Sequence, residues 1–442
     1  MLWGSKTAQA SEPDLTRTES ASKNDPCASA SQASGTAWLA GHLHHLTPEQ
    51  EEKLQEFKTL CAERKYYTPA VEQAEGVEAK TASHDDATML RFLRARKFDV
   101  EGAWGQFKDT EDWRKDNAIE ALYENIGVDS YEAARRMYPQ WTGRRDRRGI
   151  PVYVFEIRHL DNKAVAAYNS TMTTGTPETH KSSTVPARLL NLFALYENLL
   201  RFVMPLCSSL QRPNPETPIV TSTNIVDVSG VGLKQFWNLK GHMQDASVLA
   251  TAHYPETLDR IFIIGAPAFF PTVWGWIKRW FDPGTTSKIF ILSASEVQPT
   301  LTSFMEPSSI PKQYGGELDW TWGEMPNLDE PARELLQGLE QDQVDGEKRK
   351  DILKGPILFE GDHLKVLGTV DGKERRETIP VPKSQVSSEP EAPAKSTDSE
   401  AKTDEPTEIK PEDEKAVDNV AIKVNQLSVD ETQTAAAQTA AA

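Results

Sequence analysis

The sequence predicts an α/β fold: a small helical region, then a largely parallel sheet with crossover helices around an apolar pocket. From residue 151 onward, short apolar strands alternate with helical stretches, the order typical of parallel strands joined by right-handed crossovers. The strands at 261–264 and 288–292 lack polar alternation, which indicates a sheet covered on both faces. The residues between them are rich in Phe, Trp and Pro and are numerous enough for a helical crossover.

The two ends of the chain reduce the part that can fold. Residues 1–46 are dominated by Ser, Ala and Thr, and residues 384–442 contain no Phe, Trp or Tyr. The latter segment carries 13 acidic and 5 basic residues, which accounts for −8 of the net charge of −17. Because such segments bury too little apolar surface to offset the entropy of ordering, we predict a disordered N-terminal arm over 1–46 and a disordered acidic tail over 384–442.

Composition also bounds the cellular setting and the class of partner. An acidic chain without a stripe of Lys and Arg is not expected to bind nucleic acid. Cys27, Cys61 and Cys207 are scattered, without a CxxC motif, which is typical of a reducing compartment. The N-terminal residues lack the apolar core of a signal peptide, and Leu2 stands where myristoylation needs glycine. We therefore expect a cytoplasmic protein whose contact with membranes is peripheral and reversible.

The first folded part, 47–135, is predicted to be helical. Thr47 can cap a helix with Pro48 in its first turn, and Asp85 and Asp99 can cap two more. The second of these helices carries a basic cluster, and a second cluster flanks an expected turn before residue 151. By residue type alone, both clusters are typical of solvated faces paired with nearby acids. Their members are Arg91, Arg94, Arg96 and Lys97, and Arg144, Arg145, Arg147 and Arg148.

The second part, 136–322, carries the predicted sheet. Strands are expected at 151–157 and 218–228, helices at 187–204 and 233–252, and the two apolar strands follow. In such sheets ligands bind at strand ends. The third part, 323–383, is predicted to be an extension with a short helix at 331–340 and a hairpin from 363 to 379 that turns at Asp371-Gly372.

The crossover between the two apolar strands has an unusually heavy aromatic content. Its large residues recur near helical spacing, and Pro271 suits a first helical turn. Packing of these side chains in the core is the ordinary interpretation, and a mobile lid over an apolar cavity is the alternative. The uncharged run 261–277 is interrupted by Pro and Gly and is shorter than the roughly 20 residues of a membrane span. The large residues concerned are Phe269, Phe270, Val273, Trp274, Trp276, Ile277 and Trp280.

Common catalytic motifs are absent from the sequence. Gly230-Val231-Gly232 follows a strand, but Gln235 stands where the dinucleotide fingerprint needs its third glycine. The chain has no Walker A sequence, GxSxG elbow or HExxH motif. His42, His44 and His45 adjoin the expected disordered arm and are interpreted as linker residues. We predict a binding protein rather than an enzyme, without catalytic residues, cofactor or metal.

Five segments occur in order along residues 47–320: LRFLRARKFDV, RRGIPVYVFEI, HYPETLDRIFIIGAPAFF, DPGTTSKIFIL and SIPKQYGGELDW. Together they resemble the signature segments of the CRAL-TRIO lipid-binding family, in particular the Sec-fourteen-like phosphatidylinositol transfer proteins. The resemblance implies a CRAL-TRIO fold with a lipid pocket, and a protein that exchanges phospholipids at membrane surfaces. In that family the aromatic helix is a gate, here at about 268–281. Its expected hinges are Gly265, Pro267, Asp282, Pro283 and Gly284.

The resemblance also implies a phosphoinositide headgroup site formed by Arg96, Glu256, Thr285 and Lys288. The chemistry agrees, because inositol hydroxyls can donate to a carboxylate and a phosphate diester can accept from Lys, Arg and Thr. The ordinary alternative is a structural ion pair between Glu256 and Lys288.

A second headgroup site is less well matched. Where dual-ligand members have two hydroxyl residues for phosphatidylcholine, this chain has Ser222 and Asn224. The identity of the second lipid is therefore left open. Two other functions also remain as alternatives: a carrier or sensor of sterol or porphyrin, and a scaffold that positions the acidic tail. We expect a monomer with phosphatidylinositol as its ligand, a membrane surface as a transient partner and a possible protein partner for the tail.

Overall fold

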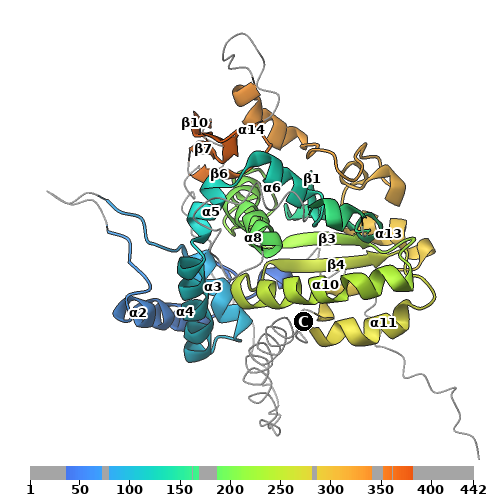
Figure 1. Cartoon of the computed structure of the whole chain (residues 1–442). Helices are drawn as coiled ribbons and strands as arrows, with labels where there is room; N and C mark the ends of the chain where they lie inside the picture. The colour runs from blue at the N-terminus through green and yellow to red at the C-terminus, as the bar shows by residue number, and fades with distance from the viewer. Residues whose placement is uncertain are drawn as a thin grey trace, which may run out of the picture. The chain divides into compact units, whose positions relative to one another are not determined.

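The computed structural model describes residues 36–71, 79–161, 163–168, 187–280, 286–340, 352–360 and 362–381. A five-stranded sheet with the order β1-β2-β3-β4-β5 forms its centre (Figure 1). Strand β1 pairs antiparallel with β2, and the pairs from β2 to β5 are parallel. The predicted largely parallel α/β sheet is confirmed. The strands span Gln140–Arg145, Pro151–Glu156, Ser222–Asp227, Leu258–Ile264 and Ile289–Ile291.

Strand β1 is the element of this sheet that the sequence did not predict. Its residues, Gln-Trp-Thr-Gly-Arg-Arg, are mostly polar, and the sequence pattern around them suggested only the turn that follows. The turn itself is present, because the backbone NH of Gly149 donates to the carbonyl of Asp146 and the φ angle of Gly149 is 91°. The pairing of β1 with β2 alone places it at the edge of the sheet, where a polar strand is tolerated.

Residues along the strands alternate between two apolar layers. Ile263 of β4 faces a cluster built with helices α10 (Leu233–His253) and α11 (Phe270–Ile277). Phe262 and Ile264 face the other cluster, which contains residues of α13 (Ala294–Phe304) and of the segment up to Trp320. This period of two on a sheet covered on both sides explains the uninterrupted apolar sequence of β4. Helix α10 runs alongside β4 in Figure 1.

Helices α2, α3 and α4 form their own apolar cluster, whereas α5 and α6 contribute to clusters that contain residues of α8 (Ala187–Asn198). Helix α2 begins with the predicted cap, in which Thr47 and Gln50 form a reciprocal capping box. Asp85 likewise caps α3 by accepting from the NH of Thr88 at 2.7 Å, whereas Asp99 precedes α4 without a capping hydrogen bond from its side chain. The helices are α2 (Pro48–Glu63), α3 (Asp86–Ala95), α4 (Val100–Asp116), α5 (Ile119–Asn125) and α6 (Val128–Arg135).

Residues 36–46 differ from the prediction of a disordered arm over 1–46. They begin with the short helix η1 (Thr36–Leu39), and the side chain of Leu39 is only 1% exposed. The guanidinium carbon of Arg148 lies 5.1 Å from the centroid of the Trp38 ring. The Trp38 ring also contacts the ring of His42. The prediction rested on the overall composition of 1–46, which is dominated by Ser, Ala and Thr, and so it overlooked the apolar residues Trp38 and Leu39. Residues 1–35 and the predicted acidic tail lie outside the described residues.

The helix predicted at 187–204 contains a change of helical type. It consists of α8 (Ala187–Asn198), a π-helical turn η4 (Leu199–Val203) and α9 (Met204–Ser209). The stretch Leu189–Ser209 is long and apolar enough to cross a membrane, yet 67% of its 18-residue window is buried. We interpret it as a core helix, since it packs against β1 and the C-terminal strands.

The 323–383 segment packs into the same core. It contains α14 (Glu330–Glu340) and a three-stranded sheet of β6 (Ile357–Glu360), β7 (His363–Val366) and β10 (Glu377–Pro380). The predicted hairpin is confirmed, since β8 (Thr369–Val370) and β9 (Lys373–Glu374) flank Asp371-Gly372. Strand β6 was not predicted. The Tyr123 hydroxyl both donates to the carbonyl and accepts from the NH of Ile357.

Short 3₁₀ helices complete the described elements. They are η2 (Ile157–His159), η5 (Lys278–Trp280), η6 (Pro307–Ser309) and η7 (Lys312–Tyr314).

Candidate functional site

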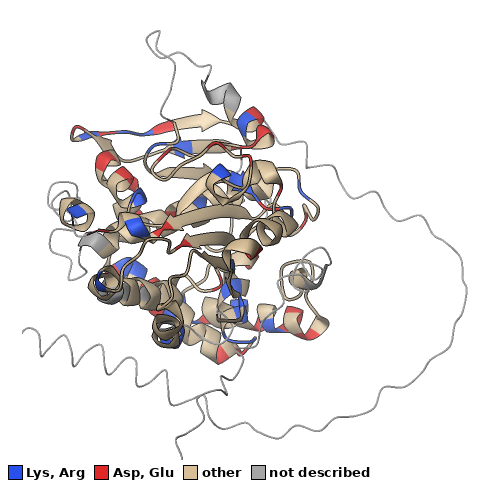
Figure 2. Ribbon diagram, turned by 90° about the vertical axis from the view of Figure 1, so that its right-hand side faces the viewer, with Lys and Arg blue, Asp and Glu red and all other residues tan. Residues whose placement is uncertain are grey.

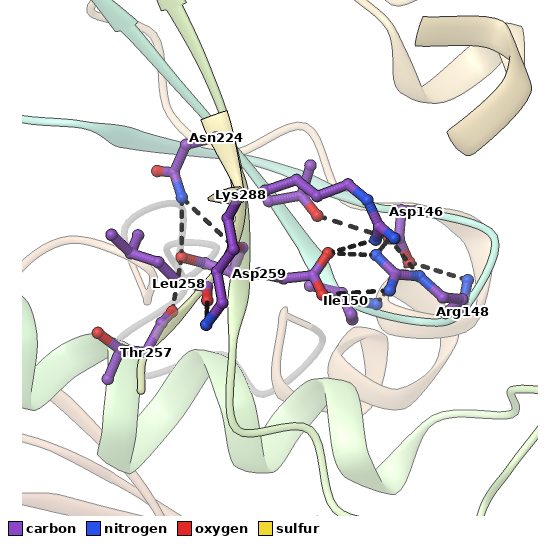
Figure 3. Close-up of polar contacts among 11 residues, drawn as sticks. Asp146, Arg148, Ile150, Asn224, Thr257, Leu258, Asp259 and Lys288 are labelled. Atoms are coloured by element: carbon purple, nitrogen blue, oxygen red, sulfur yellow. Dashed lines mark hydrogen bonds and ion pairs between the residues drawn. The ribbon is translucent and has the colours of Figure 1, made fainter. Parts of the chain in front are cut away.

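Glu256 accepts from two cations at the entrance to strand β4. Its Oε2 atom lies 3.3 Å from Nη2 of Arg94 and 3.3 Å from Nζ of Lys288. Lys288 also donates to the carbonyl oxygen of Leu258 at 3.0 Å (Figure 3). Because β4 and β5 are parallel neighbours, residues that precede the two strands meet at one edge of the sheet. We call Arg94, Glu256 and Lys288 the charged triad.

The backbone at Glu256 supports this arrangement. Its φ angle is 56°, in the left-handed region that non-glycine residues seldom adopt. This conformation costs roughly 1 kcal/mol or more and is often found at functional sites. It occurs in the short turn between α10 and β4.

Arg94 was not among the predicted site residues, and the structure brings it to Glu256. Its Nη1 atom lies 2.7 Å from Nε2 of His42, whose Nδ1 lies 3.2 Å from the carbonyl oxygen of Leu39. Burial and the nearby charge of Arg94 lower the pKa of His42 to about 4. His42 is therefore neutral near pH 7, so that Nδ1 donates to Leu39 and Nε2 accepts from Arg94. His42 is a structural partner of the triad, not a linker residue.

The four predicted phosphoinositide residues are placed differently. Glu256 and Lys288 lie together, as the family spacing implied. Arg96 is exposed at the end of α3, and among the interactions of the described residues none joins it to Glu256 or Lys288. Thr285 lies outside the described residues. Residue type alone could not tell which of Arg94 and Arg96 reaches Glu256. That depends on the rotation of α3 about its axis, which is set by the burial of Leu90 and Leu93.

A second charged network lies beside the triad. Arg148 donates to both carboxylate oxygens of Asp259 and to Oδ2 of Asp146 (Figure 3). Asp146 also accepts from the backbone NH groups of Arg148 and Ile150 at 2.8 and 3.0 Å. Burial opposes ionisation of Asp259, but the charges of Arg148 and Arg260 hold its pKa below the ordinary value. We call Arg148, Asp146 and Asp259 the aspartate network.

An apolar pocket of about 130 Å³ adjoins the triad through Thr257 and Leu258. The predicted second-site residues Ser222 and Asn224 both line it. Asn224 Nδ2 donates to Ser222 Oγ at 3.0 Å, and that hydroxyl donates to the carbonyl of Thr257 at 3.2 Å (Figure 3). The pocket also has an aromatic lining of Tyr131, Tyr138, Trp141, Tyr153 and Tyr196.

Some side chains of the predicted gate helix are buried against the sheet, and others are exposed. Phe270 and Val273 are buried in the cluster on the sheet, and Phe269 and Trp274 pack against it from partly buried positions. Trp276 is 36% exposed and stacks on Trp237 of α10, which is 48% exposed. The side chains of Ile277 and Trp280 lie outside the described residues.

Only part of the expected hinge of the gate is described. Gly265 has a φ angle of 68°, and a Cβ atom there would lie 1.8 Å from Oγ of Ser229. The backbone therefore requires glycine at this position. Pro267 provides the carbonyl that accepts from the NH of Phe270 at 2.8 Å. Asp282, Pro283 and Gly284 lie outside the described residues.

Charges of both signs are mixed over the described helices and strands, without one continuous basic stripe in that part of the chain (Figure 2). The charged triad is therefore a local feature and not the end of a wider positive surface. This distribution favours recognition of one small anionic group over that of an extended polyanion.

Comparisons with known proteins match the N-terminal helical part and the part that carries the five-stranded sheet. The family model described as CRAL/TRIO domain matches residues 135–316, and that described as CRAL/TRIO, N-terminal domain, matches residues 53–109. The SEC14 cytosolic factor of Eremothecium gossypii is 31% identical over 281 residues, covering 64% of this chain and 80% of that protein.

Two further matches extend the comparison. The phosphatidylinositol/phosphatidylcholine transfer protein SFH7 of Arabidopsis thaliana is 34% identical over 236 residues, covering 53% of this chain and 40% of that protein. The crystal structure of Sfh5 is matched with a TM-score of 0.39 and 15% identity, covering 57% of this chain and 80% of that one.

Proposed function

Because this chain belongs to the CRAL/TRIO domain family, we propose that it is a phosphatidylinositol-binding protein that exchanges or presents lipids at membrane surfaces. The relatives named as a cytosolic factor and as a phosphatidylinositol/phosphatidylcholine transfer protein support this proposal. We place the protein in the cytosol, in transient contact with membranes, and assign it a binding role rather than a catalytic one.

The observation that carries the proposal is the charged triad beside an apolar pocket. A carboxylate accepts hydrogen bonds from sugar-like hydroxyls, while Arg and Lys donate to a phosphate diester. The ammonium group of Lys288 has three N–H donors and uses two of them, on Glu256 and on the carbonyl oxygen of Leu258, so the triad retains donor capacity for a ligand. Arg96 and Thr285 remain proposed contributors on the basis of the family resemblance.

The aromatic pocket supports a second headgroup site. Ser222 and Asn224 provide a hydroxyl and an amide that would donate to a phosphate in exchange for their present acceptors, which are the carbonyl oxygen of Thr257 and atoms of Ser222. Aromatic faces such as those of Tyr153 and Tyr196 attract quaternary ammonium groups. We therefore propose phosphatidylcholine as the second ligand, with Asn224 as the departure from the expected hydroxyl pair.

A lipid needs more space than the pocket offers, and in this proposal movement of the gate helix provides that space. The space of about 130 Å³ is smaller than the roughly 300–1,000 Å³ of small-molecule sites. Acyl chains would have to displace Phe270 and Val273 from their cluster. Burial is worth roughly 0.8 kcal/mol per methylene, so release into water is slow and exchange occurs at a membrane. The exposed pair Trp237 and Trp276 suits such an interface.

Mass spectrometry of the lipids that co-purify with the full chain tests the headgroup assignment. The wild type is compared with the Glu256→Ala, Lys288→Ala double variant. The matched control is Lys312→Ala, Asp319→Ala, which removes an exposed ion pair of 3.2 Å elsewhere. We expect phosphatidylinositol in the wild type and the control, and its loss from the double variant with the fold unchanged by circular dichroism.

Other outcomes distinguish the alternatives. Retention of phosphatidylinositol by the double variant would make Glu256 and Lys288 a structural ion pair. A visible absorption band would reveal a bound porphyrin, and sterol in place of phosphoinositide would reassign the pocket. Lipid exchange that disappears when 384–442 is deleted but survives Trp276→Asp would favour the scaffold hypothesis.

A further inference from the structure

A second, larger cavity lies between the N-terminal helices and the helix that contains the π turn. It measures about 870 Å³ and shares no lining residue with the apolar pocket. Arg91 of α3, Arg114 of α4 and Arg201 of η4 all line it. We call it the arginine cavity. The π turn forms a wall between the two spaces, since Leu199 lines the pocket and Arg201 lines the cavity.

Arg91 is a buried cation without a counter-ion in contact. Arg91 is only 5% exposed, and its Nη1 atom is buried without a hydrogen-bond partner. None of the ion pairs among the described residues includes it. Burial lowers the pKa of Arg91 to about 10, so the guanidinium group remains charged at neutral pH. A buried charge in this condition is costly unless an acceptor is supplied.

Arg201 shows the same deficiency at the π turn. Its Nη1 atom is buried without a hydrogen-bond partner, and it lies 3.9 Å from Oε2 of Glu197. That carboxylate already accepts from Arg114 at 2.6 and 3.1 Å and from the hydroxyl of Tyr254 at 3.0 Å. Arg114 is thus well paired, whereas Arg201 has only a long ion pair with Glu197 and the Nη1 atoms of Arg91 and Arg201 lack a hydrogen-bond partner.

The other carboxylates of the cavity do not supply the missing acceptors. Asp85, Glu111 and Glu120 line it, yet none forms an ion pair with Arg91 or Arg201 among the described residues. Asp85 accepts from the NH of Thr88 as the cap of α3. Among the described residues, Arg91 therefore faces this space without an ion pair, and Arg201 has only its long 3.9 Å contact with Glu197.

From this arrangement we propose that the arginine cavity binds a phosphate-bearing molecule. The guanidinium groups of Arg91 and Arg201 would donate hydrogen bonds to its phosphate group. The planar guanidinium fork matches phosphate oxygens in a bidentate geometry. The volume falls within the roughly 300–1,000 Å³ of small-molecule sites, so the phosphate can carry an organic group. Its source is a soluble phosphate ester or a lipid headgroup. The site is distinct from the charged triad and does not depend on the proposed lipid exchange.

Isothermal titration of the full chain with inorganic phosphate, and separately flotation with phosphatidic acid vesicles, tests the proposal. Arg201→Gln is the principal variant, because its side chain is 29% exposed and its loss is tolerable to the fold. Arg91→Gln is the second. Arg333→Gln is the matched control, since Arg333 forms an exposed ion pair with Glu330 on α14. Melting temperatures accompany each variant.

We expect saturable phosphate binding that weakens about tenfold or more in each cavity variant, as loss of a charge-assisted bond implies. The Arg333→Gln control should bind as the wild type does. Phosphate binding that persists in the Glu256→Ala, Lys288→Ala variant but is lost in Arg201→Gln belongs to the arginine cavity and not to the charged triad. Binding of vesicles alone, lost in Arg201→Gln, would identify a lipid headgroup as the source. The proposal is overturned if neither probe binds, or if Arg201→Gln binds normally. If Arg91→Gln does not fold, Arg201→Gln decides alone.

Discussion

The charged triad and the aspartate network lie side by side at the start of strand β4, but their bonds differ. Within the triad, one carboxylate oxygen of Glu256 accepts two contacts of 3.3 Å, and the side chains of Glu256 and Lys288 are 24% and 27% exposed. Within the network, the Asp146 side chain has no exposed surface and accepts from the guanidinium group of Arg148 and from two backbone NH groups.

This difference separates two uses of opposite charge. The aspartate network is fully bonded and holds the turn before β2 against β4, so it is structural. The triad is incompletely bonded and partly open to solvent, so it can exchange partners. An ion pair alone therefore does not indicate a ligand site, whereas the unused bonding capacity of its members does.

Arg148→Ala should give the largest effect in this comparison. It leaves Asp146 and Asp259 without their shared cation, and breaking a buried pair in this way costs about 3–5 kcal/mol. Urea unfolding followed by tryptophan fluorescence measures the change. An unfolding free energy within 1 kcal/mol of the wild-type value would contradict the structural role, using about 1 kcal/mol as the limit for surface pairs.

Acidification should weaken the aspartate network by a smaller amount. The folded-state pKa of Asp259 is lowered, so its contribution is present above the unfolded value of about 4 and is lost as pH falls through the lower folded value. The unfolding free energies of wild type and Asp259→Asn should therefore converge as the pH is lowered below about 4. A constant gap between them from pH 7 to acid would refute this assignment.

Lys288→Ala should have the smallest effect on stability and a large effect on lipid exchange. The partly exposed pair with Glu256 is worth about 0–1 kcal/mol. Loss of a charge-assisted bond to phosphate should slow phosphatidylinositol transfer between vesicles about tenfold or more. Lys312→Ala is the control for both assays. Destabilisation as large as that of Arg148→Ala would remove the distinction between the two regions.

The sequence supported the central part of the fold because its strands are apolar runs. Strands β2 to β5 and α10 were predicted at nearly their observed positions. The polar strand β1 was missed because edge position, and not composition, makes it a strand. Of the triad, Glu256 and Lys288 were expected from the resemblance of their flanking segments to the CRAL-TRIO family. Arg94 was not, because its direction depends on the rotation of α3 against the rest of the molecule.

The bonds between Tyr123 and Ile357 have a consequence for biosynthesis. They join residues 234 positions apart, and β6 packs beside the π turn whose residues line the apolar pocket. At about 5–20 residues per second, a ribosome needs roughly ten to fifty seconds to make the intervening chain. During the later part of that interval, once residues 199–202 have been made, Leu199 and Phe202 lack their C-terminal cover. We expect the nascent protein to need chaperone protection until its last strands emerge.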